Sequence, residues 1–140
     1  MSEIIAVDIT IPSQTKYLSL IGRIGENLAH TAIPFLGDRD ELAFHLNLVL
    51  TEAATNAICH GNREDPDKQL RVVISISEER LFLQVFDQGK GFDLYKLAGS
   101  VAKETDEEGR GVQLICRLMD AVDYRKSPDG YVLEMVKNLQ

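Results

Sequence analysis

The sequence is poor in cysteine and in long apolar runs, and both shortages exclude whole classes of protein. Only two of its 140 residues are cysteine, and neither Cys59 nor Cys116 belongs to a metal-binding motif, so reduced thiols are expected instead of a disulfide framework. Charged residues interrupt every apolar run well before the ~20 residues that a bilayer-spanning helix needs. Residues 1–3 carry no basic segment of the kind that opens a secretory signal. We therefore expect a cytoplasmic protein that makes no contact with a membrane.

Basic residues are also in short supply. The 15 lysine and arginine residues are outnumbered by 22 aspartate and glutamate residues, which gives a formal net charge of -7. Nucleic-acid backbones recruit dense positive charge, so direct binding of nucleic acid is not expected, and proteins or small ligands are the expected partners. A chain of this length, with 44% hydrophobic residues, can bury a single core. We expect one domain that covers residues 1–140.

Five strands are predicted, the first two by apolar residues at every second position and the other three by apolar segments beside short turns. Successive side chains of a strand point to opposite faces, so such alternation is typical of a sheet with one buried face. Only short turn-forming segments separate the second strand from the third and the fourth from the fifth, so each of these pairs is expected to form an antiparallel hairpin. The predicted strands span residues 5–11, 70–76, 81–86, 122–126 and 131–136.

Apolar residues at helical spacing predict three helices. The first is expected to be capped by Ser13. The second is expected to begin at Asp38, with Glu41 three residues later in an arrangement like a capping box, and to end at Gly61-Asn62. The third is expected to be introduced by residues 109–111.

The polar segment 92–108 is long for a connection within a compact domain, so we predict that it forms a lid. The order of elements is then strand, helix, helix, strand, strand, lid, helix, strand, strand. This order predicts an α+β two-layer sandwich in which helices cover one face of a mixed or antiparallel sheet. The other face of the sheet would meet water or a partner.

Three short clusters hold the candidate functional residues. In the first, Glu-Ala-Ala-Thr-Asn-Ala-Ile-Cys-His-Gly, Glu52 and Asn56 lie one helical turn apart and therefore on the same face of the helix. An acid beside an amide is a candidate site, although such a pair taken alone usually belongs to a solvated helix face. His60, near the end of this cluster, is interpreted as a structural residue that binds carbonyl groups of the last turn of the helix.

The second cluster, Asp-Gln-Gly-Lys-Gly-Phe, begins with Asp87 at the end of an apolar strand. Glycine lets the backbone turn tightly and approach a ligand, and the carboxylate could accept a hydrogen bond from an exocyclic amine. A turn capped by aspartate is an equally good interpretation. The third cluster, Gly109-Arg110-Gly111, opens a helix whose free amide groups can hold phosphate oxygens, with Arg110 adding positive charge.

Taken together and in this order, the clusters resemble the N, G1 and G2 boxes of the GHKL (histidine-kinase-like) ATPases, across roughly residues 10–136. A Walker P-loop motif is absent, so a nucleotide site of that other type is not supported. Within the GHKL superfamily, the first cluster, Asp-Gln-Gly-Lys-Gly-Phe-Asp and Gly-Arg-Gly-Val-Gln-Leu-Ile-Cys-Arg-Leu-Met-Asp are similar to the anti-sigma-factor serine/threonine kinases.

The resemblance implies a Bergerat-type fold that binds ATP and Mg²⁺. It implies that Glu52 is the general base, that Asn56 coordinates Mg²⁺ and that Asp87 binds the adenine amine. The other residues that it implicates shape the floor of the pocket or hold phosphate oxygens: Gly89, Gly91, Gly109, Arg110 and Gly111.

The resemblance also implies partners. The chain would form a homodimer, phosphorylate a serine or threonine of a STAS-type anti-sigma factor antagonist, and sequester a sigma factor. One alternative is a module that grips its partners in the ATP state and transfers no phosphate. Another is an acidic α+β domain whose glycines serve only turns. Binding of ATP separates this last alternative from the other two, and transfer of phosphate separates the kinase from the binding module.

Overall fold

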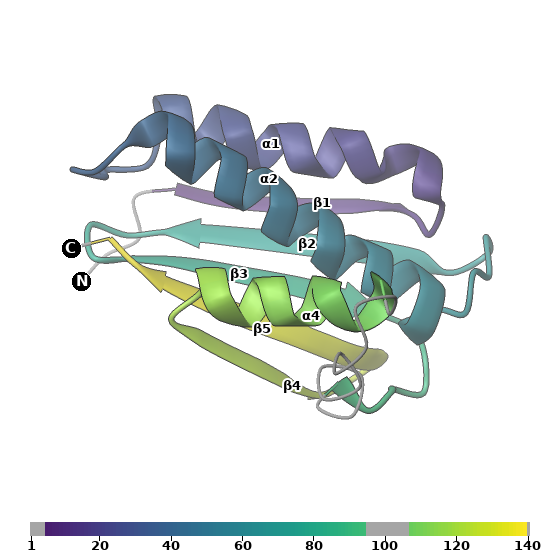
Figure 1. Ribbon diagram of the computed structural model, residues 1–140. Helices are drawn as coiled ribbons and strands as arrows, with labels where there is room; N and C mark the ends of the chain where they lie inside the picture. Colours follow the sequence, from purple (N-terminus) through teal and green to yellow (C-terminus); the bar gives the residue numbers. More distant parts are fainter. Residues whose placement is uncertain (1–4, 95–106, 140) are drawn as a thin grey trace.

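The computed structural model describes residues 5–94 and 107–139. In this part of the chain, one five-stranded sheet forms one layer and three α-helices form the other (Figure 1). The strand order is β1-β2-β3-β5-β4, and every neighbouring pair is antiparallel. The predicted two-layer α+β sandwich with helices on one face is confirmed, and its sheet is antiparallel.

All five predicted strands are present, each within three residues of its predicted ends. Residue pairs across the sheet follow one continuous register; Ile74 of β2, for example, faces Val7 of β1 on one side and Leu83 of β3 on the other. The predicted hairpins, β2 with β3 and β4 with β5, are both present. The strands are β1 (Ile5–Pro12), β2 (Gln69–Ile76), β3 (Arg80–Asp87), β4 (Ala121–Ser127) and β5 (Gly130–Asn138).

The core lies between the sheet and the helices. Alternate side chains of β3 point into this layer, and Leu81, Leu83 and Val85 are at most 1% exposed. Asp87 continues the same alternation, so its carboxylate also points into the helix layer. The period of the strand therefore places one acidic side chain at the edge of an apolar core, where it is 3% exposed.

The first helix, α1 (Leu18–Thr31), does not begin as predicted. A single 3₁₀ turn, Thr15–Tyr17, precedes it, and no side chain caps either element. The expectation that Ser13 caps this helix was wrong: Ser13 is buried, and its hydroxyl oxygen accepts a hydrogen bond from Nδ2 of Asn62 at 2.9 Å. A serine hydroxyl can bond either to free helix amides or to another polar group, and here a distant buried amide takes it.

The second helix, α2 (Arg39–Asn56), begins as predicted. Oδ1 of Asp38 accepts hydrogen bonds from the backbone nitrogens of Asp40 and Glu41, at 3.0 and 3.1 Å. Beyond the last α-helical residue the chain continues as a π-helical turn, Ala57–Gly61, which ends where the sequence predicted. Such turns occur mostly as single insertions in α-helices, often at functional sites.

The third helix, α4 (Glu107–Leu118), begins two residues earlier than predicted. The Gly109-Arg110-Gly111 cluster therefore lies within its first turns and does not precede it. The start of α4 lies beside the end of α2, so the first and third clusters meet at one end of the sandwich (Figure 1). Most of the predicted lid, residues 95–106, lies outside the described residues.

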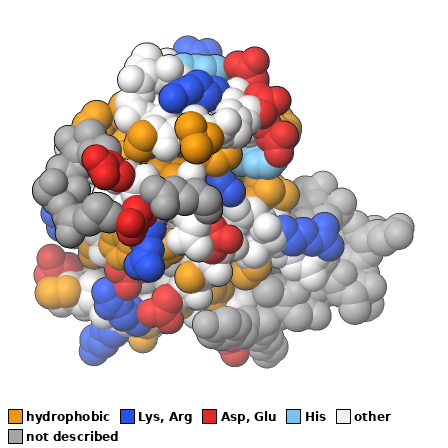
Figure 2. All heavy atoms as spheres, turned by 90° about the vertical axis from the view of Figure 1, so that its left-hand side faces the viewer, with side chains coloured by type: hydrophobic (Ala, Val, Ile, Leu, Met, Phe, Trp, Pro, Cys, Tyr) orange, Lys and Arg blue, Asp and Glu red, His pale blue; other side chains and the backbone are white. Residues whose placement is uncertain are grey.

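Figure 2 shows the opposite end of the sandwich, where β5 ends and α2 begins. Basic, acidic and hydrophobic side chains are interspersed on this face, with no large region of a single sign of charge. Within the described residues, no helix combines the length and the hydropathy required to cross a bilayer.

Candidate functional site

Asp87 is the buried acidic side chain of the site. Its Oδ1 accepts a hydrogen bond from the backbone nitrogen of Gly89 at 2.8 Å. Burial raises the pKa of Asp87, while backbone hydrogen bonds from Gly89 and Tyr131 and the positive charge of Lys68 act in the opposite direction. A carboxylate has about four acceptor positions, so this one retains capacity for the amine of a ligand.

Glycines surround Asp87 because no side chain fits there. A Cβ atom on Gly61 would overlap the Asp87 carboxylate, and a Cβ atom on Gly89 would overlap the carbonyl oxygen of Gly61. Gly91 has a φ of 87°, in the left-handed region that favours glycine, and a Cβ atom there would meet the ring of Tyr131 at 2.7 Å. The end of α2 and the loop after β3 are therefore in direct backbone contact.

Gly61 was given only one role by the sequence, that of ending α2. The structure adds a second, because Gly61 is the residue against which the Asp87 carboxylate lies. The available signal was its position as the last residue of the first cluster, but nothing local to that cluster indicates contact with a strand end 26 residues later.

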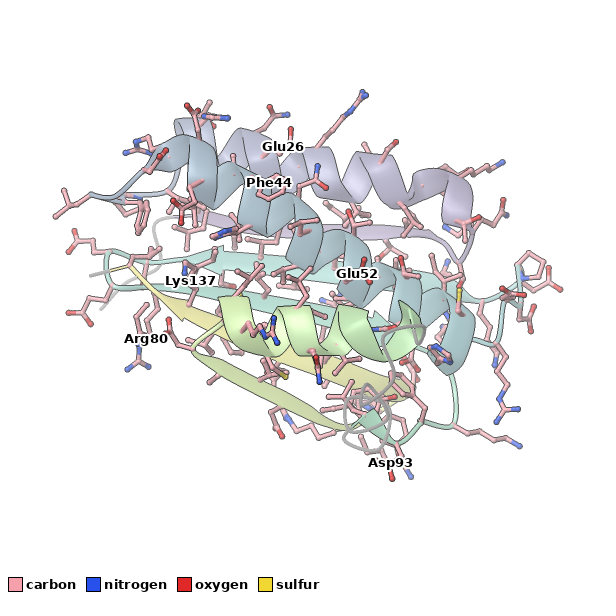
Figure 3. All side chains as sticks on the ribbon, viewed as in Figure 1. Glu26, Phe44, Glu52, Arg80, Asp93 and Lys137 are labelled. Atoms are coloured by element: carbon pink, nitrogen blue, oxygen red, sulfur yellow. The ribbon has the colours of Figure 1, made fainter. Side chains whose placement is uncertain are left out.

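Glu52 projects from α2 toward α4 (Figure 3). A Cβ atom on Gly111 would overlap Oε2 of Glu52, so the absence of a side chain at this position of α4 makes room for the carboxylate. Glu52 is half-buried, and burial raises the pKa of its carboxyl group. The structure thus brings two predicted site residues from separate clusters, Glu52 and Gly111, into contact.

The raised pKa of Glu52 predicts how stability depends on pH. Because the folded-state pKa exceeds the unfolded one, the group favours folding while it is protonated, and this contribution is lost as pH rises through the folded-state pKa. We expect Glu52→Gln to raise the melting temperature at pH 8 relative to the parent, with the difference shrinking toward about pH 4, near the ordinary glutamate pKa. Thermal unfolding of both proteins across this pH range checks the prediction. It would be contradicted if the melting temperature of the variant minus that of the parent were smaller at pH 8 than at pH 4.

Asn56 lies one helical turn beyond Glu52 and is 4% exposed. Its Nδ2 atom is buried and has no hydrogen-bond partner among the described residues. An unsatisfied buried polar group costs about 1–3 kcal/mol, so this amide is available to a ligand. The oxygen of the same amide is a ligand type that Mg²⁺ accepts, so the side chain fits the implied metal. Among the described residues there is no group of three or more His, Cys, Asp or Glu that could hold a metal without such help.

Gly109 and Arg110 are placed by the backbone of α4 alone. Both lie in the first turn, where backbone N–H groups have no partner within the helix. This end of the helix carries a partial positive charge that favours phosphate oxygens. The side chain of Arg110 lies outside the described part of the structure.

A row of aromatic rings lies on the helix face of the sheet beside this site. Phe92 is 4.8 Å from Tyr124 and 5.5 Å from His60 between ring centroids, and Tyr124 stacks on Tyr131 at 5.1 Å. His60 contacts Phe92, while its predicted bonds to helix carbonyls stay a prediction. A pocket of about 410 Å³ opens here, lined by Cys59, His60, Arg63, Glu64, Gly91 and Phe92.

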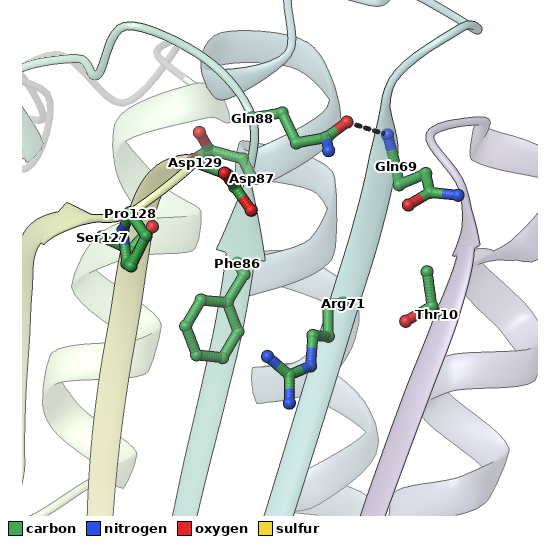
Figure 4. Close-up of a pocket in the computed structure, with 9 residues that line it drawn as sticks. All are labelled: Thr10, Gln69, Arg71, Phe86, Asp87, Gln88, Ser127, Pro128 and Asp129. Atoms are coloured by element: carbon green, nitrogen blue, oxygen red, sulfur yellow. Dashed lines mark hydrogen bonds between the residues drawn. The ribbon is translucent and has the colours of Figure 1, made fainter.

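A second pocket lies on the sheet face without helices (Figure 4). Arg71 borders it, but its guanidinium already donates two hydrogen bonds to Asp8, at 2.9 and 2.7 Å, and lies over the ring of Phe86. Among the predicted site residues whose side chains the structure describes, Asp87 alone lines this pocket, at the end of β3. The three clusters therefore converge on the helix side of the sheet and not here.

Comparison with known proteins agrees with this arrangement. The model of one family, described as a histidine kinase-like ATPase domain, matches residues 12–137. The chain belongs to this family. The match includes all three clusters, so the residues gathered at this end of the sandwich are those of a histidine kinase-like ATPase domain.

Two relatives narrow the assignment. The domain is 31% identical over 105 residues to the "Anti-sigma F factor" of Anoxybacillus flavithermus, covering 71% of each chain. It is 25% identical over 142 residues to the "Serine-protein kinase RsbW" of Bacillus cereus (strain AH187), covering 96% of this chain and 85% of that one. The predicted membership of the anti-sigma kinase branch of the GHKL ATPases is confirmed.

A solved structure shares the fold. The histidine kinase domain of the blue-light activated histidine kinase from Erythrobacter litoralis EL346 matches with a TM-score of 0.51 at 21% sequence identity. The match covers 92% of this chain and 62% of that chain, less than two thirds of its length. At this identity the likeness shows the fold alone.

Proposed function

We propose that this histidine kinase-like ATPase domain is a protein serine/threonine kinase that transfers the γ-phosphoryl group of ATP to an anti-sigma factor antagonist. The observation that carries the proposal is the contact of Glu52 with Gly111 of α4, with the buried Asn56 one turn further along α2, at the end of the sandwich that also holds the buried Asp87. This end of the sandwich holds a group suited to each of three substrate parts: the adenine amine, the phosphate chain and the acceptor hydroxyl.

Each residue has one task in this proposal. Asp87 accepts a hydrogen bond from the adenine amine, and the α4 amides with Arg110 hold phosphate oxygens. The Asn56 side chain would hold Mg²⁺, which when bound supplies positive charge to the transferring phosphoryl group. Gly89 keeps the loop after β3 against Gly61 and Gly91 keeps it against the ring of Tyr131, so both shape the floor of the pocket.

The transfer step assigns the proton to Glu52. The acceptor hydroxyl oxygen forms a bond to the γ-phosphorus while the bond from that phosphorus to the bridging oxygen of ADP breaks, and Glu52 takes the hydroxyl proton. The half-buried position of Glu52 raises its pKa, which makes its ionised form a stronger base than an exposed glutamate.

The names of two relatives support the proposed partners. One relative is named as an anti-sigma factor and another as a serine-protein kinase, which supports a chain that both sequesters a sigma factor and phosphorylates a STAS-type antagonist. We include a homodimer in the proposal, since the sheet face without helices is uncovered in the single chain.

The proposal is tested by incubating the purified chain with Mg²⁺, γ-labelled ATP and a STAS-type antagonist. Label is expected on the antagonist, and none on a matched antagonist in which the acceptor serine is replaced by alanine. If ATP binds and no label is transferred, the chain is an ATP-gated binding module, the second candidate. If calorimetry detects no binding of ATP, both candidates are wrong.

A further inference from the structure

Asn62, the residue after Gly61, joins the end of α2 to three strands. It is 0% exposed, and both ends of its side-chain amide are bonded. Oδ1 accepts a hydrogen bond from the backbone nitrogen of Gln88 at 2.7 Å. Nδ2 donates to the carbonyl oxygen of Gln69 at 3.0 Å and to the hydroxyl oxygen of Ser13 at 2.9 Å. One side chain therefore links the segments next to β1, β2 and β3.

The chemistry of these partners determines the orientation of the amide. The backbone N–H of Gln88 can only donate, and the carbonyl oxygen of Gln69 can only accept, so the oxygen must face Gln88 and the nitrogen must face Gln69. The main chain of Asn62 is held as well, because its nitrogen donates to the carbonyl oxygen of Ala57 at 2.7 Å. The position of Oδ1 is thus set by four separate bonds.

Gln88 is the residue directly after Asp87, and it is held at a second point. Its Oε1 accepts a hydrogen bond from the backbone nitrogen of Gln69 at 2.7 Å (Figure 4). The peptide group that follows Asp87 therefore cannot rotate without breaking its bond to Asn62. On the other side, Gly61 lies against the carboxylate of Asp87. Two consecutive residues, Gly61 and Asn62, thus contact the two halves of the Asp87–Gln88 unit.

We propose that Asn62 is a positioning residue for base selection: its bond to the Gln88 nitrogen sets the direction of the Asp87 carboxylate toward the adenine amine. The inference rests on the proposed function only in that an adenine nucleotide binds at Asp87, and it is independent of phosphate transfer. The two ends of the Asn62 amide then have different tasks. The oxygen serves base selection, and the nitrogen holds the ends of β1 and β2 together.

Substitutions can separate these two tasks. Asn62→Ala removes both. Asn62→Asp keeps an oxygen for the Gln88 nitrogen but loses the amide donor that faces Gln69. Ser13→Ala removes only a partner of the nitrogen and is the matched control, since Ser13 is also buried but its hydroxyl bonds to Asn62 and not to Gln88.

The experiment measures the dissociation constants of the protein for ATP and for inosine triphosphate, each in the presence of Mg²⁺. The base of inosine triphosphate carries a carbonyl oxygen where adenine carries the amine. The parent is expected to prefer ATP. In Asn62→Ala the affinity for ATP falls about tenfold while that for inosine triphosphate is unchanged, so the preference collapses. Asn62→Asp and Ser13→Ala are expected to lower the melting temperature and to keep the preference.

Two results would overturn the inference. In one, Asn62→Ala keeps the parent's preference for ATP. In the other, the substitution lowers the affinity for both nucleotides by the same factor, as expected if Asn62 were purely structural. If Asn62→Ala does not fold, Gln88→Ala replaces it, because Gln88 is exposed and its side chain is the second attachment of the same segment. That variant keeps the backbone nitrogen that bonds to Asn62 but loses the other attachment of the segment, so the preference for ATP is expected to fall about threefold. An unchanged preference would show that holding this segment does not select the base, and would overturn the inference.

The results that would refute the role of Asn62 differ from those that would refute the proposed kinase. A parent chain that prefers ATP but labels no antagonist would refute the kinase and leave the role of Asn62 standing. A parent that binds neither nucleotide would refute both. A parent that labels the antagonist, with a preference for ATP that does not depend on Asn62, would refute the role of Asn62 alone.

Discussion

Glu52→Ala is expected to lower the rate of phosphate transfer to the antagonist by about 10²–10⁴-fold and to leave the affinity for ATP within about twofold. The reason is that the carboxylate acts on the proton of the acceptor hydroxyl, while the base and the phosphate chain are held by other groups. Glu52 contacts Gly111 of α4, so its removal opens space without removing a helix amide. Single-turnover labelling of the antagonist measures the rate, and calorimetry measures the affinity.

The matched control is Glu41→Ala. Glu41 is an exposed glutamate on the same helix, one that contributes only its backbone nitrogen to the Asp38 cap. We expect normal labelling and normal affinity in this variant. Transfer by Glu52→Ala at the parent's rate would remove Glu52 from the role of base, and a parallel loss of ATP affinity would show that its part is binding.

Asp87→Asn is expected to weaken binding of ATP by about 10–100-fold. The carboxylate offers only acceptors, whereas an amide can turn a donor toward the adenine amine and leave both groups unsatisfied. Folding should survive the change, because burial already raises the pKa of this carboxyl group and a neutral amide avoids burying its charge. Inosine triphosphate is expected to lose less affinity than ATP, since its carbonyl oxygen can accept from the new amide.

Asp129→Asn is the control for this prediction. Asp129 is an exposed acid in the turn between β4 and β5, on the same end of the sheet. Calorimetry on the two variants gives a direct comparison in chains of equal charge. Parent-like affinity in Asp87→Asn would place the adenine elsewhere, and the proposed nucleotide site would have to be abandoned.

Local chemistry was sufficient to predict the elements and the faces on which the candidate residues lie. The apolar run of residues 81–86 predicted β3, with Asp87 at its end. A spacing of four residues put Glu52 and Asn56 on one face of α2, and Asp38 caps that helix because its short carboxylate reaches amides two and three residues ahead. Each of these features depends on neighbours within about one turn or a few strand residues.

Ser13 shows where such reasoning ends. A serine before a helix is a sound prediction of a cap, but its hydroxyl bonds instead to Asn62, 49 residues later. This outcome could not be predicted locally, because the hydroxyl of Ser13 and the amide of Asn62 come together only after the layers pack.

By itself, the sequence determined the two-layer fold, the three clusters and their resemblance to one ATPase superfamily, because periodicity and short motifs are written in adjacent residues. Only the tertiary structure decided that Gly61 lies against Asp87, that Gly111 makes room for Glu52 and that Asn62 holds Gln88. These contacts join segments that are distant in sequence and are brought together by the sheet register and by the packing of the helices. Where two segments touch, there is room only for glycine, and buried polar groups need a hydrogen-bond partner such as Asn62.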